Sequence, residues 1–187
     1  MWLEAVFTRE DLLTFLAQLV PVTFRLGERG DLSLDGPFVL SLTPAKGISI
    51  ACGGKLHWPL FGVSVPATLD SIVVLVRPEV EVRDGGHALI FKLEIEHAAV
   101  AYLPATVDRQ LVARVNEELS KKELELVWRF DKTLSHLFVL PPALASVEAL
   151  VVEVTGGSAK VTDSAVGFAV AFKAEVRKRP VTPAGGR

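Results

Sequence analysis

The chain has almost no cysteine and no excess of basic residues. Its 187 residues include one cysteine, Cys52, so no disulfide can form within the chain and no zinc site can be built from cysteines. The net charge is −2, whereas a general nucleic-acid binder needs a basic surface to displace counterions from phosphates. We therefore expect no nucleic-acid partner, and we interpret Cys52 as a buried, unreactive thiol rather than a nucleophile.

Long hydrophobic runs are also missing. The longest apolar stretch, residues 137–145, is interrupted by Pro141 and Pro142, and a membrane-spanning helix needs about 20 apolar residues. No signal peptide is visible at the start, so the expected location is cytoplasmic as given, or periplasmic if a leader was removed. The basic residues 177–179 are typical of a solvated tail, and the competing interpretation is a peripheral contact with anionic lipid.

No linear motif of catalysis, phosphate binding or metal binding is present. The histidines do not fall at metal-ligand spacing; they are His57, His87, His97 and His136. His97 is in phase with Ile95 on an alternating strand and is predicted to point inward. Glu94 and Glu96 share a strand face with Lys92, which is typical of a solvated face. We expect no catalytic residue, no metal ligand and no cofactor, with an enzyme whose active site has no linear motif kept as a minor alternative.

The chain is rich in apolar residues, which make up 50% of it, and its mean hydropathy is +0.38. This surplus could fill a core, line an apolar groove or cover a subunit interface. No linker or composition break divides the sequence. It is predicted to form one domain over residues 1–177, followed by a disordered tail at residues 178–187.

Two amphipathic helices are predicted, over residues 8–20 and 106–121. Thr8 can cap the first helix, and Asp11 stands three residues later, as in a loose capping box. Pro21 ends the first apolar pattern. The apolar stripe of the first helix is Leu12, Leu13, Phe15, Leu16, Leu19 and Val20, and that of the second is Val107, Leu111, Val112, Val115 and Leu119.

The remainder alternates with a period of two, which favours antiparallel strands. Strands are predicted for residues 72–76, 80–83, 88–97, 124–130, 137–140, 147–155, 158–161 and 168–176. Asp84-Gly85-Gly86 supplies the positive φ angles of a tight hairpin, and Gly156-Gly157 is predicted to be a second turn.

The order of helix, strands, helix and strands resembles the TULIP superfamily of tubular lipid-binding proteins, which includes the BPI-like and SMP domains. It is most similar to the small single-domain bacterial lipoproteins of that group. The resemblance rests on residues 7–13, on residues 30–34, and on the second helix with Tyr102, Leu103, Pro104, Val107, Leu111, Val115, Asn116, Glu118 and Leu119. It implies an α+β fold in which a long, twisted antiparallel sheet wraps around two amphipathic helices. The chain departs from the group because it has no lipid-anchoring cysteine after a leader.

The resemblance further implies non-enzymatic binding or carriage of a hydrophobic ligand, such as a fatty acid, in a groove between sheet and helices. The alternative is a structural or interaction module that uses its apolar surface for homodimerisation or for binding another partner. The candidate ligand-binding residues are Phe15, Leu16, Leu19, Phe91, Leu93, Leu111, Val115, Leu119, Phe168 and Phe172.

Overall fold

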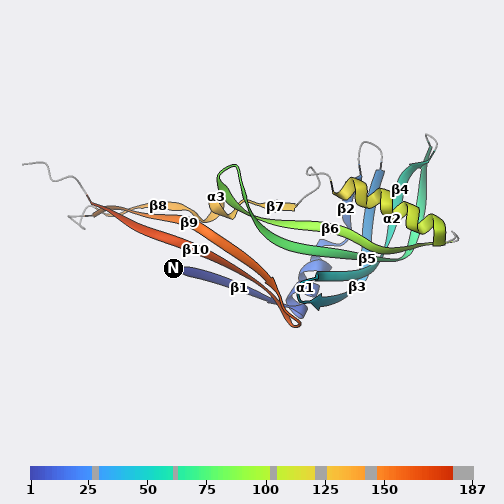
Figure 1. The fold of residues 1–187 in the computed structure, drawn as a ribbon, viewed down its shortest axis with the longest axis horizontal. Coiled ribbons are helices and arrows are strands. Elements are labelled where there is room, and N and C mark those ends of the chain that lie inside the picture. The colour runs from blue at the N-terminus through green and yellow to red at the C-terminus, as the bar shows by residue number, and fades with distance from the viewer. Residues whose placement is uncertain (27–29, 61–62, 102–104, 121–125, 142–146, 179–187) are drawn as a thin grey trace, which may run out of the picture.

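The computed structural model describes residues 1–26, 30–60, 63–101, 105–120, 126–141 and 147–178. About 70% of these residues lie in strands and 19% in helices. The molecule is elongated, with a four-stranded sheet at one end and a six-stranded sheet at the other (Figure 1). Residues 179–187 of the predicted tail lie outside the described residues, and Lys178 is the last residue of the final strand.

Both sheets are antiparallel and curled. The order of the strands is β1-β10-β9-β8 in the smaller sheet and β2-β3-β4-β5-β6-β7 in the larger one. The strands are β1 (Trp2–Thr8), β2 (Val22–Leu26), β3 (Gly30–Thr43), β4 (Gly47–Leu60), β5 (Val63–Arg83), β6 (Gly86–Val100), β7 (Leu126–Trp128), β8 (His136–Val139), β9 (Val147–Val161) and β10 (Ala165–Lys178).

The helices are α1 (Arg9–Leu19), α2 (Ala105–Leu119) and the five-residue α3 (Phe130–Leu134). The first two lie where the apolar periodicity predicted helices. The predicted hairpin between β5 and β6 is also present, with Asp84 at φ 49° and Gly85 at φ 77° in its turn. The local signals of capping residues and turn residues were therefore sufficient to place these elements.

The predicted arrangement of one sheet wrapped around two helices is wrong. The structure contains two curled sheets, and each of the longer helices covers a different core. The strands are long, up to 21 residues in β5, so that their apolar positions meet one another within the curled sheet. The helices are too short to fill such an interior, and α1 has no fully buried residue.

Three cores hold the fold together. The α2 core joins α2 to the six-stranded sheet and consists of Leu26, Leu32, Leu34, Cys52, Leu56, Leu69, Ile72, Val74, Ile95, Ala98, Val100, Val115 and Leu119. The α1 core lies beside α1 and consists of Leu40, Leu42, Ile48, Ile50 and Val166. The α3 core consists of Leu89, Phe130 and Val170. The last two contain residues of both sheets, so they are what joins the sheets.

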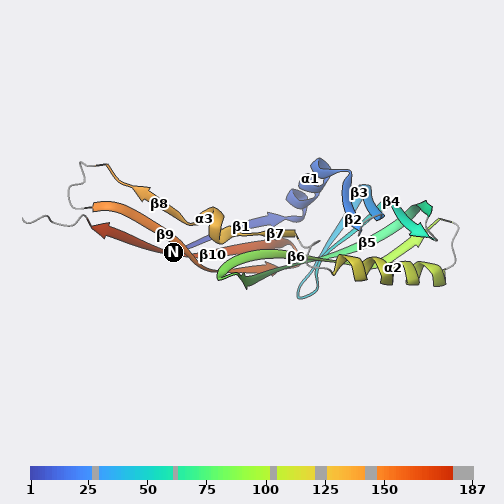
Figure 2. The same cartoon turned by 90° about the horizontal axis from the view of Figure 1, so that it is seen from above.

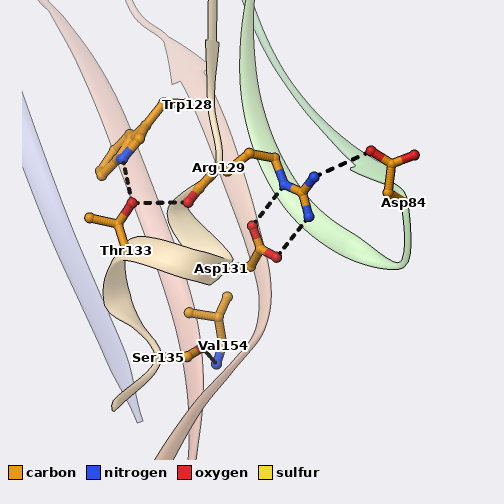
Figure 3. A network of polar contacts seen from close by, with 7 residues as sticks. All are labelled: Asp84, Trp128, Arg129, Asp131, Thr133, Ser135 and Val154. Carbon is orange, nitrogen blue, oxygen red and sulfur yellow. Dashed lines mark hydrogen bonds and ion pairs between the residues drawn. The ribbon is translucent and has the colours of Figure 1, made fainter.

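Polar contacts around α3 add to this junction (Figure 3). Arg129 Nε and Nη2 each donate to Asp131 at 3.1 Å, and Nη1 lies 3.4 Å from Asp84 in the β5–β6 turn. On the other side, Ser135 Oγ accepts a hydrogen bond of 3.1 Å from Val154 N in β9. The segment around the short helix is thereby attached to the β5–β6 turn of one sheet and to β9 of the other.

Three local predictions need correction, and one strand was missed. Gly156-Gly157 is not a turn, because β9 runs through it and Phe130 packs against the backbone there. His97 is exposed instead of inward, because β6 has an extra residue opposite Val73 and Val74 and this bulge changes which face the later residues occupy. The predicted strand over 124–130 is shorter, since Phe130 begins α3, and residues 124–125 lie outside the described residues. Residues 2–8 form a strand that was not predicted.

Candidate functional site

The main candidate site is an open, largely apolar groove of about 650 Å³ beside α1. It lies where the two sheets meet, since its walls come from β1, α1, β4, β6 and β10 (Figure 2). The residues that line it are Val6, Phe7, Asp11, Leu12, Thr14, Phe15, Gln18, Ile48, Phe91, Val166 and Phe168. Its volume falls within the range of small-molecule sites, about 300–1,000 Å³.

Phe168 lines this groove and contacts aromatic rings of both sheets. Its ring lies 5.9 Å from that of Phe7 in β1 and 6.2 Å from that of Phe91 in β6, in both cases edge to face. Edge-to-face packing of this kind is a favoured geometry of aromatic pairs. Phe168 therefore connects the two sheets. Together with the fully buried Val166, it forms part of the apolar lining of the groove.

One face of α1 supplies the polar part of the groove. Asp11, Thr14 and Gln18 follow one another at intervals of three and four residues, so they lie along the same side of the helix. Asp11 also closes the predicted capping box, because its Oδ2 accepts hydrogen bonds from Thr8 N at 2.9 Å and from Thr8 Oγ1 at 2.7 Å. These two bonds lower the pKa of the Asp11 carboxyl, so it is ionised at neutral pH.

The structure brings three of the ten predicted ligand-binding residues into this groove: Phe15, Phe91 and Phe168. Leu16 packs against the α1 core, and Leu19 is exposed at the end of the same helix. Phe172 packs against the α3 core. The first helix and the last strand thus meet at the groove, through only some of the named side chains.

The other four predicted residues lie elsewhere. Leu93 and Leu111 pack against the α2 core, and Val115 and Leu119 are buried in it. The space between α2 and its sheet is only about 10 Å³, so it is filled by side chains. The α1 and α2 residues do not surround one common interior.

Sequence reasoning missed much of the groove lining. Val6 and Phe7 were not assigned because β1 was not recognised, and Ile48 lies on a strand that was not singled out. Asp11 was noted as a capping residue but not as part of a site. The available clue was the capping signal, because it fixes where α1 begins. It therefore also fixes which residues of α1 lie next to the end of β1.

The charged side chains that the sequence singled out on β6 form ion pairs with neighbouring strands or turns. Glu94 pairs with Arg77 at 2.6 Å, Glu96 pairs with Lys46 at 2.7 Å, and Lys92 lies 2.5 Å from Glu79, all on the surface. No group of three or more potential metal ligands occurs within the described ranges. That the chain has no catalytic residue stays a prediction.

Cys52 is buried in the α2 core. Its burial, with a smaller effect of the Asp35 charge, raises the pKa of the thiol to about 11. Because the thiolate is the reactive form, so high a pKa leaves almost none of it at neutral pH.

No protein-family model matches the chain, and neither the curated proteins nor the solved structures include a significant match. Among the helices that the structure describes, none is long and apolar enough to cross a membrane. The resemblance to tubular lipid-binding proteins stays a prediction, and the sheet-around-helices arrangement that it implied is wrong.

Proposed function

We propose that the chain binds a hydrophobic, lipid-like ligand in the groove beside α1. The observation that carries this proposal is the composition of the lining, in which eight apolar side chains are accompanied by three polar ones on a single helix face. Binding sites for small organic molecules are typically apolar with a few polar groups that fix orientation. Phe15 and Phe7 remain partly exposed at the groove, so a ligand there would remove apolar surface from water.

The proposal predicts saturable binding of a neutral apolar probe that a bulky side chain can block. We expect N-phenyl-1-naphthylamine to increase its fluorescence on binding to the parent protein. Thr14 is exposed and lines the groove, so Thr14→Trp should fill part of it and weaken probe binding by about tenfold or more.

The matched control is Ala17→Trp, which places the same indole on an exposed position of α1 outside the groove lining. It should bind the probe as the parent does, and thermal melts should show that both variants fold. Absence of probe binding by the parent, or equal binding by both variants, would contradict the proposal.

A second candidate function, self-association through the four-stranded sheet, is favoured by a separate observation. Half of the large apolar side chains that are exposed in the described part of the chain lie on strands of this sheet: Trp2, Leu3, Val6, Phe7, Leu137, Phe138, Val139 and Val176. The outer edge of β1 pairs with no strand in that part of the chain. An apolar edge strand without proline or lysine is a ready partner for another strand.

The backbone of β1 determines how a second copy would pair. Met1 and Phe172 exchange backbone hydrogen bonds, so residues in phase with Met1 direct their N–H groups toward β10, and Trp2, Glu4 and Val6 direct theirs outward. Two β1 strands related by a two-fold axis at Ala5 would pair Glu4 with Val6 of the other copy. This is the longest such register, and it keeps the two Glu4 charges from lying opposite each other.

A further inference from the structure

The charge at the groove constrains which amphiphile it can take, and this inference rests on the function proposed above. Of the described residues that line the groove, Asp11 is the charged one, and the lining includes no lysine, arginine or histidine. The cationic side chains that the structure describes form no ion pair with Asp11. The polar side of the groove is therefore negative.

The remaining polar groups are hydrogen-bonding but neutral. Thr14 and Gln18 lie on the same face of α1 as Asp11, and both can donate and accept hydrogen bonds. Both hydrogen bonds that the Asp11 carboxylate accepts from Thr8 go to Oδ2, and the carboxylate can accept further bonds through Oδ1. A head group that donates hydrogen bonds matches this row, whereas a carboxylate or a phosphate would meet the Asp11 charge without a cation to offset it.

We propose that the groove selects a single-chain amphiphile whose head group donates hydrogen bonds and carries no negative charge, such as a long-chain amine or alcohol. The apolar tail lies over Phe91, Val166 and Phe168, and the head group lies beside the polar face of α1. A fatty acid is disfavoured, because its carboxylate would be repelled by Asp11. At a separation of about 4 Å in a water-like medium this repulsion corresponds to about a fivefold loss of affinity.

The test measures how well three ligands with the same alkyl chain displace bound N-phenyl-1-naphthylamine from the groove at pH 7. The ligands are dodecylamine, dodecanol and dodecanoic acid. For the parent protein we expect the amine and the alcohol to displace the probe at concentrations several-fold lower than the acid. In Asp11→Asn the disadvantage of the acid should disappear, because the charge is removed while the amide oxygen can still accept the Thr8 N–H bond.

The matched control is Glu10→Gln, which removes one negative charge from the same helix turn at a residue outside the groove lining. It should keep the parent's order of ligands, and melting curves should show that both variants fold. If the acid displaces the probe from the parent as well as the amine does, the head-group inference is wrong while the proposed groove stands. If the probe binds but none of the three ligands displaces it, the inference and the lipid-like function both fail. Probe binding that weakens as dimers form would place a second copy in the groove and overturn both.

Discussion

At the scale of single residues, two neighbouring glycines in β9 have very different surroundings. A Cβ atom on Gly157 would lie 2.7 Å from Phe130 Cζ and 3.2 Å from the carbonyl oxygen of Ala169. Phe130 is 2% exposed, so its ring has little room to move. A Cβ atom on Gly156 would meet only the Ala171 Cβ, at 4.0 Å. The close approach of the Phe130 ring explains why position 157 is glycine.

We therefore expect Gly157→Ala to lower the free energy of unfolding by about 1–3 kcal/mol, the usual cost of overpacking. Gly156→Ala should change it by less than about 1 kcal/mol, because the methyl group fits. Urea denaturation of the two variants and the parent measures both values. Equal effects of the two substitutions would show that the Phe130 ring does not pack against this part of β9.

At the scale of elements, α3 is the piece that attaches β6 to β9, and its polar contacts depend on pH. The Arg129 side chain, which hydrogen-bonds to Asp131, lowers the pKa of the Asp131 carboxyl below its ordinary value. A group whose pKa is lower in the folded state stabilises the fold above its unfolded pKa, about 3.9, and this stabilisation is lost as the pH falls through the folded pKa.

We expect Asp131→Asn to be less stable than the parent at pH 7, and we expect the difference to shrink as the pH falls below about 4. Urea midpoints measured between pH 7 and pH 3 test this. In an Arg129→Met background the same substitution should have a smaller and less pH-dependent effect. A gap between parent and Asp131→Asn that stays constant over this pH range would contradict the assignment of the stabilisation to this pair.

The elements differ in how far the sequence could predict them. The capping pair Thr8 and Asp11 and the turn Asp84-Gly85 act on their own neighbours, so a local pattern was enough to place α1 and the β5–β6 hairpin. His97 was misplaced because a bulge depends on the partner strand, which the sequence of β6 does not contain. Gly156-Gly157 looks like a turn locally, but it is part of a strand because it pairs with Val170 and Ala171 of β10, which the sequence of β9 does not contain.

The same difference between local and long-range contacts explains which residues of the groove could be predicted. Phe15 could be assigned to an apolar helix face from its spacing alone. Its neighbours in the groove, Phe91 and Phe168, could be named as apolar strand positions, but the pairing that joins them to β1 could not be predicted. Leu111 and Val115 follow an equally clear apolar stripe, yet they belong to a closed core. A helical stripe shows which side is covered and does not distinguish a filled core from an open groove.

At the scale of the whole molecule, the exposed edge of β1 predicts a dimer that a single backbone change can disrupt. The parent protein should show concentration-dependent dimerisation in sedimentation velocity. Glu4→Pro removes an N–H that points away from β10, so it should abolish dimerisation with little loss of stability.

Glu4→Gln is the control, because it removes the charge but keeps the backbone N–H, and it should dimerise at least as well as the parent. Ala5→Pro should instead destabilise the monomer, because the Ala5 N–H points toward β10. A parent that sediments as a monomer at all concentrations, or Glu4→Pro that dimerises like the parent, would exclude pairing through this edge.

The pairing of β1 with β10 has a consequence for how the protein is made. Residues 2–8 are synthesised long before their partners at 165–171. Until then Trp2, Leu3 and Phe7 have no strand to pair with, and neither Val166 nor Phe168 exists to complete the groove. Contacts between such distant segments form slowly, and unpaired apolar strands are prone to aggregate meanwhile. The nascent chain therefore carries an unpaired apolar strand for much of its synthesis, and the groove cannot be completed until β10 has been made.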